Sequence, residues 1–305
     1  MSPVRVTWLR TVGMTRSLYS TALSVGGFLA ASAVLFAFNL ESAEGSMLPL
    51  AAVWSVSVAP FLPALAAFLA MDVWSDERQT GRIEFLLSAP VKERDYTVGK
   101  FLGVLSSLAF SVFLSLASTM LALRFFSPSA LVGSDLPGFI PGFLALLLQG
   151  ALWSAVSVAM SAIFNHAAAA AAASLVLLVG VPRGGWFAAM AWAPQGRTAF
   201  GAMPLDAHAI DMASGLVSSG AVLSYLILTV VALFVASKCV AAFRFRGRGA
   251  LGLRFSTAFS VVLALVLAGL AVLLAYRMDA KLDIPVGDSE IAFSPRTRNI
   301  LAEAR

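Results

Sequence analysis

Hydrophobic residues in this chain collect into seven long stretches that short polar segments separate. The stretches run approximately over Leu18–Asn39, Leu50–Met71, Phe101–Leu123, Phe139–Phe164, Ala167–Val181, Ala221–Phe243 and Phe255–Tyr276. A helix needs about 20 consecutive apolar residues to cross a bilayer core of about 30 Å, because every backbone polar group must be satisfied within the segment. The fifth stretch is short and rich in alanine, so it inserts least favourably. The pattern predicts an all-α, polytopic membrane protein.

Composition and charge agree with a membrane protein whose basic residues are sorted to one side. Hydrophobic residues make up 59% of the chain and charged residues 12%, whereas about 25% is ordinary for soluble domains. The basic residues on the predicted cytoplasmic side are Arg5, Arg10, Arg16, Arg78, Arg82, Lys92, Arg94, Lys100, Lys238, Arg244, Arg246, Arg248 and Arg254. Because cytoplasmic segments carry the excess of Lys and Arg, we expect a multi-pass protein of the inner (plasma) membrane with a cytoplasmic N-terminus. Seven spans then place Arg277–Arg305 outside. The net charge of +5 indicates topology and contact with anionic lipids, not with nucleic acid.

The first 17 residues carry a helical pattern ahead of the first span. Val4, Trp8 and Val12 share one face, and Arg5 and Arg16 lie off it. This spacing suits a short helix lying in the cytoplasmic membrane interface, although a simple basic flank is compatible with the same residues. A cleaved secretory signal does not fit, because the apolar run is too long for one and further spans follow.

One polar island, Asp72–Lys100, holds more than a quarter of all charged residues. The second span is predicted to continue as a helix to Gln79, and Thr80 and Gly81 interrupt it. Thr80 can cap a short helix over Arg82–Ser88, which Pro90 ends, and a further polar helix begins near Lys92 and leads into the third span. A short apolar helix at the tip of a charged loop indicates a docking surface for a soluble partner. A connector lying on the lipid headgroups is the alternative.

The chain shows no pattern for catalysis, cofactors or metals. Gly247, Gly249 and Gly252 match G-x-G-x-x-G, but they join two membrane helices instead of a strand and a helix. Gly99-Lys100 lacks the other residues of a phosphate-binding loop. No Cys, His and carboxylate cluster has metal-ligand spacing. The span interiors hold no ionisable residue, which argues against ion-coupled transport. We therefore expect neither an enzyme nor a nucleotide site within this chain.

The island sequence DERQTGRIEFLLSAPVKERDYTVGKFLG resembles the segment after the second span in type-2 ABC exporter permeases. It is most similar to the gliding-motility-type branch of that family. The resemblance implies a coupling helix that sits in a cleft of a separate ATPase subunit, in an assembly of two ATPases and two permeases. It also implies that the island residues contact the ATPase: Glu77, Arg78, Gly81, Arg82, Glu84, Phe85, Leu86, Leu87 and Pro90.

The resemblance covers roughly residues 1–245 and implies a plan for the whole chain. An interfacial helix (1–17) precedes a six-span permease domain (18–245) with its coupling loop (72–100), and a basic loop and an extra seventh span (246–276) follow. The tail (277–305) resembles the start of the auxiliary protein that accompanies gliding-type permeases, with Ser294 and Pro295 placed to begin a helix. The tail is either the truncated start of an auxiliary domain or a segment that docks on a separate auxiliary subunit.

These observations predict the transmembrane subunit of an ATP-driven exporter that pairs with a second permease copy and hydrolyses nothing itself. A membrane scaffold that anchors an extracytoplasmic assembly is the main alternative, and a passive channel is disfavoured by the lack of charged rings. The substrate cannot be assigned from the sequence. Gln149 and Trp153, one turn apart, could line a pathway, but packing between helices is the simpler role.

Overall fold

The computed structural model describes residues 3–17, 19–43, 49–88, 91–126, 138–180, 208, 211–243 and 250–283. Its helices in chain order are α1 (Pro3–Ser17), α2 (Tyr19–Ala43), α3 (Leu50–Val58), α4 (Leu62–Ala70), α5 (Asp72–Gln79), α6 (Arg82–Ser88), α7 (Glu93–Phe126), α9 (Phe139–Ile163), α10 (Ala167–Leu175), α13 (Ser219–Phe243) and α14 (Ala250–Arg277). A 3-10 turn, Ala59–Phe61, joins α3 to α4, and a π-helical turn, Val176–Gly180, extends α10. Two short strands, β1 (Leu216–Ser218) and β2 (Lys281–Asp283), complete the described elements.

Six helical segments within the described ranges are long and apolar enough to cross a membrane, which confirms an all-α polytopic membrane protein. They are α2, the run from α3 to α5, α7, α9, α13 and α14. The predicted fifth span appears as the shorter apolar helix Ala167–Gly180. It is shorter than the other six segments, and its alanine side chains supply less apolar surface for insertion into a membrane.

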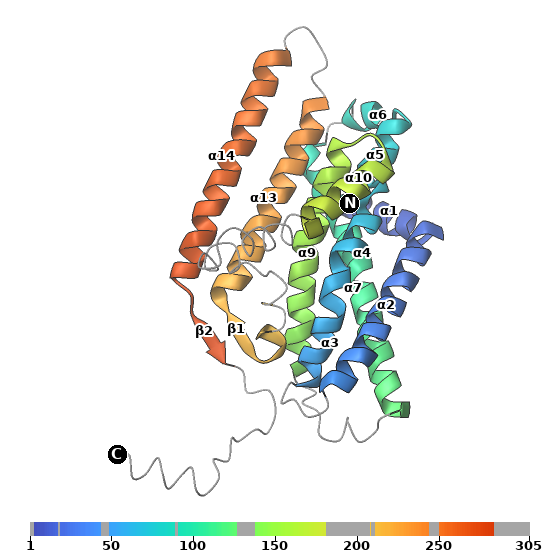
Figure 1. Ribbon diagram of the computed structural model, residues 1–305. Coiled ribbons are helices and arrows are strands. Elements are labelled where there is room, and N and C mark those ends of the chain that lie inside the picture. The colour runs from blue at the N-terminus through green and yellow to red at the C-terminus, as the bar shows by residue number, and fades with distance from the viewer. Residues whose placement is uncertain are drawn as a thin grey trace, which may run out of the picture.

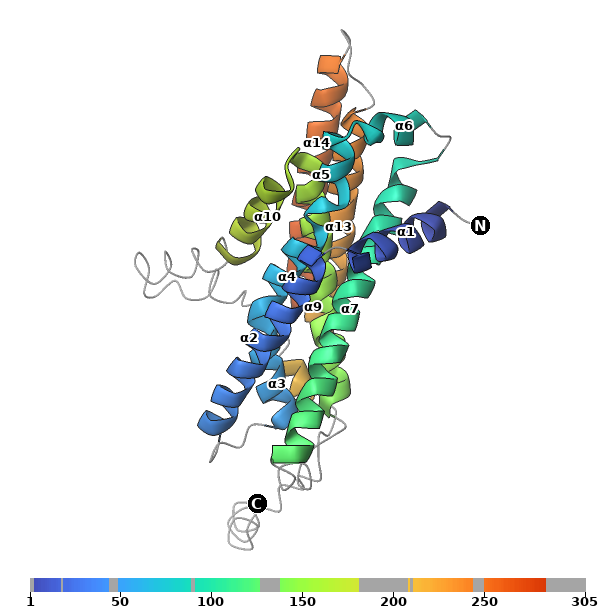
Figure 2. The same cartoon turned by 90° about the vertical axis from the view of Figure 1, so that its right-hand side faces the viewer.

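The helices form an elongated bundle whose ends differ in content (Figure 1). One end, which we call the α6 end, carries α5 and α6, the start of α10, the end of α13 and the start of α14. The opposite end carries the start of α3, the start of α13 and both strands (Figure 1). Helix α1 lies across the bundle against α7 instead of along it (Figure 2). In this view α7 and α14 run away from the α6 end, whereas α9 and α13 both run toward it (Figure 1).

Helix α9 is the central helix of the bundle and packs against α3, α4, α5, α7, α10 and α13. Its buried face includes Leu146, Gln149, Trp153 and Val158. Within its most apolar stretch 61% of the residues are buried, against 17% in α14. Gln149 and Trp153 therefore lie inside the packed bundle, in keeping with the packing role.

The seventh span, α14, packs along α13, and the two strands join their ends. Strands β1 and β2 pair antiparallel, with Val217 opposite Leu282. The Asp279 carboxylate accepts hydrogen bonds from the Gly220 backbone N–H (2.8 Å) and the Ser218 hydroxyl (2.7 Å). These bonds hold the pKa of Asp279 below its usual range, the Gly220 amide contributing most. His208 and Tyr276 are hydrogen-bonded nearby, Nε2 to Oη, at 2.9 Å.

Candidate coupling site

The polar island folds as two short helices at the α6 end of the bundle. Helix α5 spans Asp72–Gln79 and helix α6 spans Arg82–Ser88, which are the bounds predicted from the sequence. Gly81 lies between them at φ +70°, a left-handed conformation that glycine adopts without steric cost. The predicted capping role of Thr80 is wrong. Its hydroxyl donates to the Asp76 carbonyl of α5 at 2.8 Å and accepts a bond from the Arg82 Nε, so it closes α5 instead of starting α6.

Helix α5 is fastened to the end of α9 by hydrogen bonds between side chains and backbone. The Ser161 hydroxyl accepts from the Trp74 backbone N–H (3.0 Å) and donates to the Met71 carbonyl (3.0 Å). The Arg78 Nη1 donates to the Ala162 carbonyl at 2.7 Å, which occupies one of the orphan carbonyls at the C-terminus of α9. Beyond it, the Gln79 Nε2 lies 2.9 Å from the Nδ1 of His166, at the start of α10.

A buried ion pair fastens the other side of α5 to α7. The Lys100 Nζ lies 2.5 Å from the Glu77 Oε2, and both side chains are only 5% exposed. The same ammonium donates to the Val73 carbonyl and lies 3.7 Å from the ring centroid of Trp74. Two charges taken out of water are tolerable only when they are paired and further hydrogen-bonded, and this arrangement meets both conditions. The ion pair therefore fixes the position of α5 on α7.

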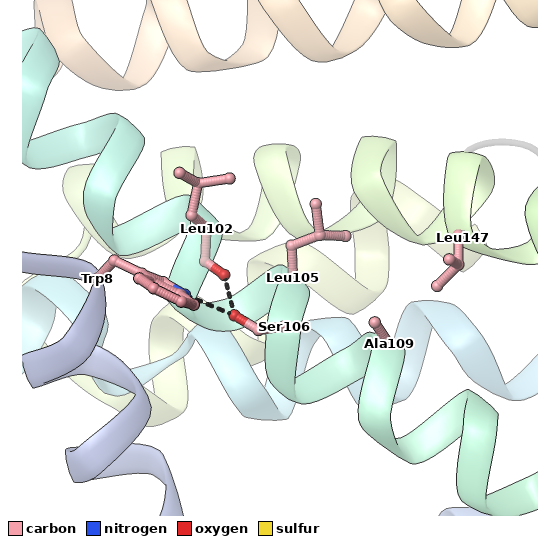
Figure 3. A pocket seen from close by; sticks show the side chains of 6 residues that line it. All are labelled: Trp8, Leu102, Leu105, Ser106, Ala109 and Leu147. Carbon is pink, nitrogen blue, oxygen red and sulfur yellow. Dashed lines mark hydrogen bonds between the residues drawn. The ribbon is translucent and has the colours of Figure 1, made fainter. Parts of the chain in front are cut away.

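Helix α1 buttresses the same part of α7 through close backbone packing. A side chain at Gly99 would lie 2.7 Å from the Thr7 Cβ, and one at Gly103 would lie 2.5 Å from the Thr11 Cβ. The two glycines, four residues apart, thus allow α1 to approach α7 closely, as small residues do between membrane helices. The Trp8 indole N–H donates to the Ser106 hydroxyl at 2.8 Å (Figure 3). The helix predicted for residues 1–17 is present, and its Thr7 and Thr11 face is buried.

The structure brings the predicted contact residues together at one end but gives them different surroundings. Arg82 and Glu84 are exposed on α6, and an ion pair of 3.1 Å joins Arg82 to Asp76. Glu77 is buried at its lysine partner, and Arg78 is half-buried against α9. The side chains of Phe85, Leu86 and Leu87, as well as Pro90, lie outside the described residues. Among the predicted contact residues, Arg82 and Glu84 of α6 are thus the charged side chains that are exposed to a partner.

Sequence reasoning did not find the residues that hold the loop in place. Ser161 and the Thr7 and Thr11 pair give no signal of their own, because serine and threonine are scattered through every span. Glu77 and Lys100 are separated by 23 positions, and only the fold brings them together. The spacing of Gly99 and Gly103 was the one readable hint of a close helix crossing.

Among the described residues no group of three or more His, Cys, Asp or Glu side chains could hold a metal ion. Cys239 is a free cysteine. Gly247 and Gly249 of the G-x-G-x-x-G match lie outside the described residues.

Comparison with known protein families identifies one family that this chain matches. A family profile described as "ABC-2 family transporter protein" matches residues 9–281. The match continues through α14, beyond residue 245, where the resemblance read from the sequence stopped. No match to a curated protein was found.

Proposed function

Because the chain belongs to the ABC-2 family of transporter proteins, and is thus a multi-pass membrane subunit of the kind that pairs with an ABC ATPase, we propose that it is the permease of an ATP-driven exporter. In this proposal a separate ATPase subunit binds at α6 and hydrolyses the nucleotide. A second permease copy and a second ATPase complete the transporter. The membrane orientation that this requires places the α6 end in the cytoplasm, as the distribution of basic residues favours.

The way α5 is held supports the proposal more than any other observation. Helix α6 follows α5 directly, and α5 is bonded to α7 through Lys100, to α9 through Ser161 and to α10 through His166. If the docking helix were part of a free loop, a movement of the partner would only bend that loop locally. A docking helix whose neighbour is bonded to three other helices transmits the movement to them, because packed interfaces shift between discrete arrangements instead of deforming continuously.

The mechanism then follows from these attachments. When the ATPase subunits close on ATP, they displace α6 and with it α5. Helix α5 continues α4 through Met71, so the second span tilts, and the ion pair carries α7 and the overlying α1 along. The bundle thereby reorients between two states without any chemistry of its own.

The test is co-purification with an ABC ATPase subunit from the same cells, followed by measurement of ATP hydrolysis. We expect the tagged wild-type protein to bring the ATPase with it in mild detergent. Leu86→Asp and Leu87→Asp, each in α6, should remove the ATPase while the permease stays monodisperse. The matched control is Leu282→Asp, whose side chain is exposed in β2 at the opposite end.

Two results would count against the proposal at different levels. ATPase retained at wild-type stoichiometry by the α6 variants would mean that docking occurs elsewhere. No ATPase with the wild-type protein, under several detergents and with nucleotide present, would favour a membrane scaffold without transport.

Two finer assignments are part of the same proposal and rest on the sequence resemblance. We place the chain in the gliding-motility-type branch and expect an extracytoplasmic auxiliary subunit to meet the region after β2. Purification of that subunit with the full chain, but not with a chain that ends at residue 283, is the expected result. Equal recovery with both chains would place the contact on the bundle itself.

A further inference from the structure

An apolar groove lies where α1 crosses α7. It is lined by Trp8 of α1, by Leu102, Leu105, Ser106 and Ala109 of α7, and by Leu147 of α9, and its volume is about 410 Å³. Trp8 stands at one end and Leu147 at the other (Figure 3). The groove is open to the outside of the bundle along a helix that spans the membrane.

The polar atoms of the groove are already occupied by each other. The Trp8 indole N–H donates to the Ser106 hydroxyl, and that hydroxyl donates to the Leu102 carbonyl (Figure 3). The surface left for an occupant is therefore almost entirely carbon. An occupant that carries hydrogen-bonding groups into the groove would find no partner there, and such burial is costly. A hydrocarbon chain meets no such cost.

The length of α7 indicates at which level of the membrane the groove lies. Its 34 residues make a helix of about 51 Å, which is about 20 Å longer than a bilayer core. The excess lies at the charged start of α7, so its crossing with α1 at Gly99 and Gly103 falls near the headgroups. The groove runs from that level toward the bilayer centre, from Leu102 to Ala109. Trp8 sits at the interface, where tryptophan is favoured.

The charge of α1 selects the kind of headgroup. Residues 1–40 contain Arg5, Arg10 and Arg16 and no acidic residue. Arg5 and Arg10 are exposed on α1, and Arg5 lies one helical turn before Trp8. A basic helix above an apolar groove between membrane helices is complementary to a lipid that has a negative headgroup and a hydrocarbon tail.

We propose that the groove between α1, α7 and α9 is a binding site for an anionic phospholipid, with one acyl chain against Leu102, Leu105, Ala109 and Leu147 and the headgroup at Arg5 and Arg10. The site depends on the protein lying in a membrane and does not depend on the ATPase partner. It holds α1 against α7 from the lipid side, next to the hydrogen bond between Trp8 and Ser106.

The experiment counts lipids retained by the full chain in native mass spectrometry, after incubation with phosphatidylglycerol or phosphatidylcholine. We expect one tightly retained phosphatidylglycerol, favoured over phosphatidylcholine by about fivefold for each arginine that reaches the headgroup. Ala109→Phe fills the groove and should lose this lipid. Ala122→Phe, on an exposed position of α7 outside the groove, should keep it. Arg5→Gln with Arg10→Gln should bind both lipids equally.

Several outcomes would overturn the proposal. Ala109→Phe that keeps the same lipid count as Ala122→Phe would mean only the ordinary lipid annulus. Equal retention of the two lipids by the wild-type protein would remove the anionic headgroup. Should Ala109→Phe fail to give a monodisperse protein, Ala109→Leu and Leu147→Trp provide smaller and more distant fillings of the same groove, and the same comparison decides.

Discussion

Helices α5 and α14 stand at two sides of the molecule and are attached in opposite ways. Helix α5 is surrounded by α4, α6, α9 and α10 and is locked by a buried ion pair and backbone-directed bonds. Helix α14 packs along α13, and most of the apolar side chains described for it, from residue 256 on, are exposed. Within the described residues, the bonds at its end come from Asp279, Tyr276, Ala280 and the strand pair. A tightly held helix transmits movement, whereas a peripheral one can shift without disturbing the bundle.

The largest expected effect comes from breaking the ion pair on the α5 side. Lys100→Met leaves the Glu77 carboxylate buried and unpaired, which should destabilise the protein by about 3–5 kcal/mol. Replacing both partners, Glu77→Gln with Lys100→Met, should recover much of this loss because no charge stays buried. Unfolding by SDS in mixed micelles measures both. Lys281→Met in exposed β2 is the control on the α14 side and should change little.

The same pair of variants also separates stability from coupling. If the ion pair transmits movement, the double variant should bind the ATPase through α6 but hydrolyse ATP without the stimulation that the assembled wild-type transporter shows. A double variant with wild-type stimulation would show that the pair only supports the fold, and the transmission route through α7 would be withdrawn.

A steric change tests the same comparison with a smaller expected loss of stability. Gly103→Val places a Cβ 2.5 Å from the Thr11 Cβ, so α1 must move away from α7, at a cost of about 1–3 kcal/mol. The identical change at Gly269 in α14 meets no atom within 4 Å and should be nearly neutral. Thermal stability in detergent compares the two. Equal losses of thermal stability at both positions would mean that other atoms pack against Gly269 of α14 in the folded protein.

Much of this fold is readable from the sequence, but the contacts that hold the island in place are not. Hydropathy located the spans, and the turn residues Thr80 and Gly81 fixed the bounds of α5 and α6, because these signals are local. The fifth apolar stretch was predicted to be a span, but within the described residues it forms the shorter apolar helix Ala167–Gly180. The pairing of Glu77 with Lys100 and of Ser161 with α5 depends on how α7 and α9 pack. Such tertiary contacts leave no periodic pattern in the sequence. The Thr80 hydroxyl was assigned to the wrong helix for a different reason, since it lies between two helices and bonds back to Asp76 of α5.

Acid should loosen the α14 side through Asp279. The pKa of Asp279 is lowered by the Gly220 amide and the Ser218 hydroxyl, so its stabilising effect is present above the ordinary Asp pKa of about 3.9 and is lost as the pH falls through the lower folded value. Asp279→Ala removes this cap of α13 at every pH and should cost about 1 kcal/mol. Amide exchange at Gly220 reports the effect, with Glu41→Gln at the exposed end of α2 as the control. Protection of Gly220 that is insensitive both to acid and to Asp279→Ala would contradict this assignment.

The smallest effect on ATPase binding is expected from removing α14 altogether. A chain that ends at residue 249 loses a helix that contributes little to the buried core, since 17% of its apolar stretch is buried. The docking helix α6 and the bonds of α5 to α7, α9 and α10 are all retained. The truncated protein should therefore still bring the ATPase with it, although β1 loses its partner strand and becomes more accessible to exchange. Loss of the ATPase on truncation, in a protein that stays monodisperse, would show that α14 supports the α6 end through α13. The contrast between a transmitting region and a peripheral one would then no longer hold.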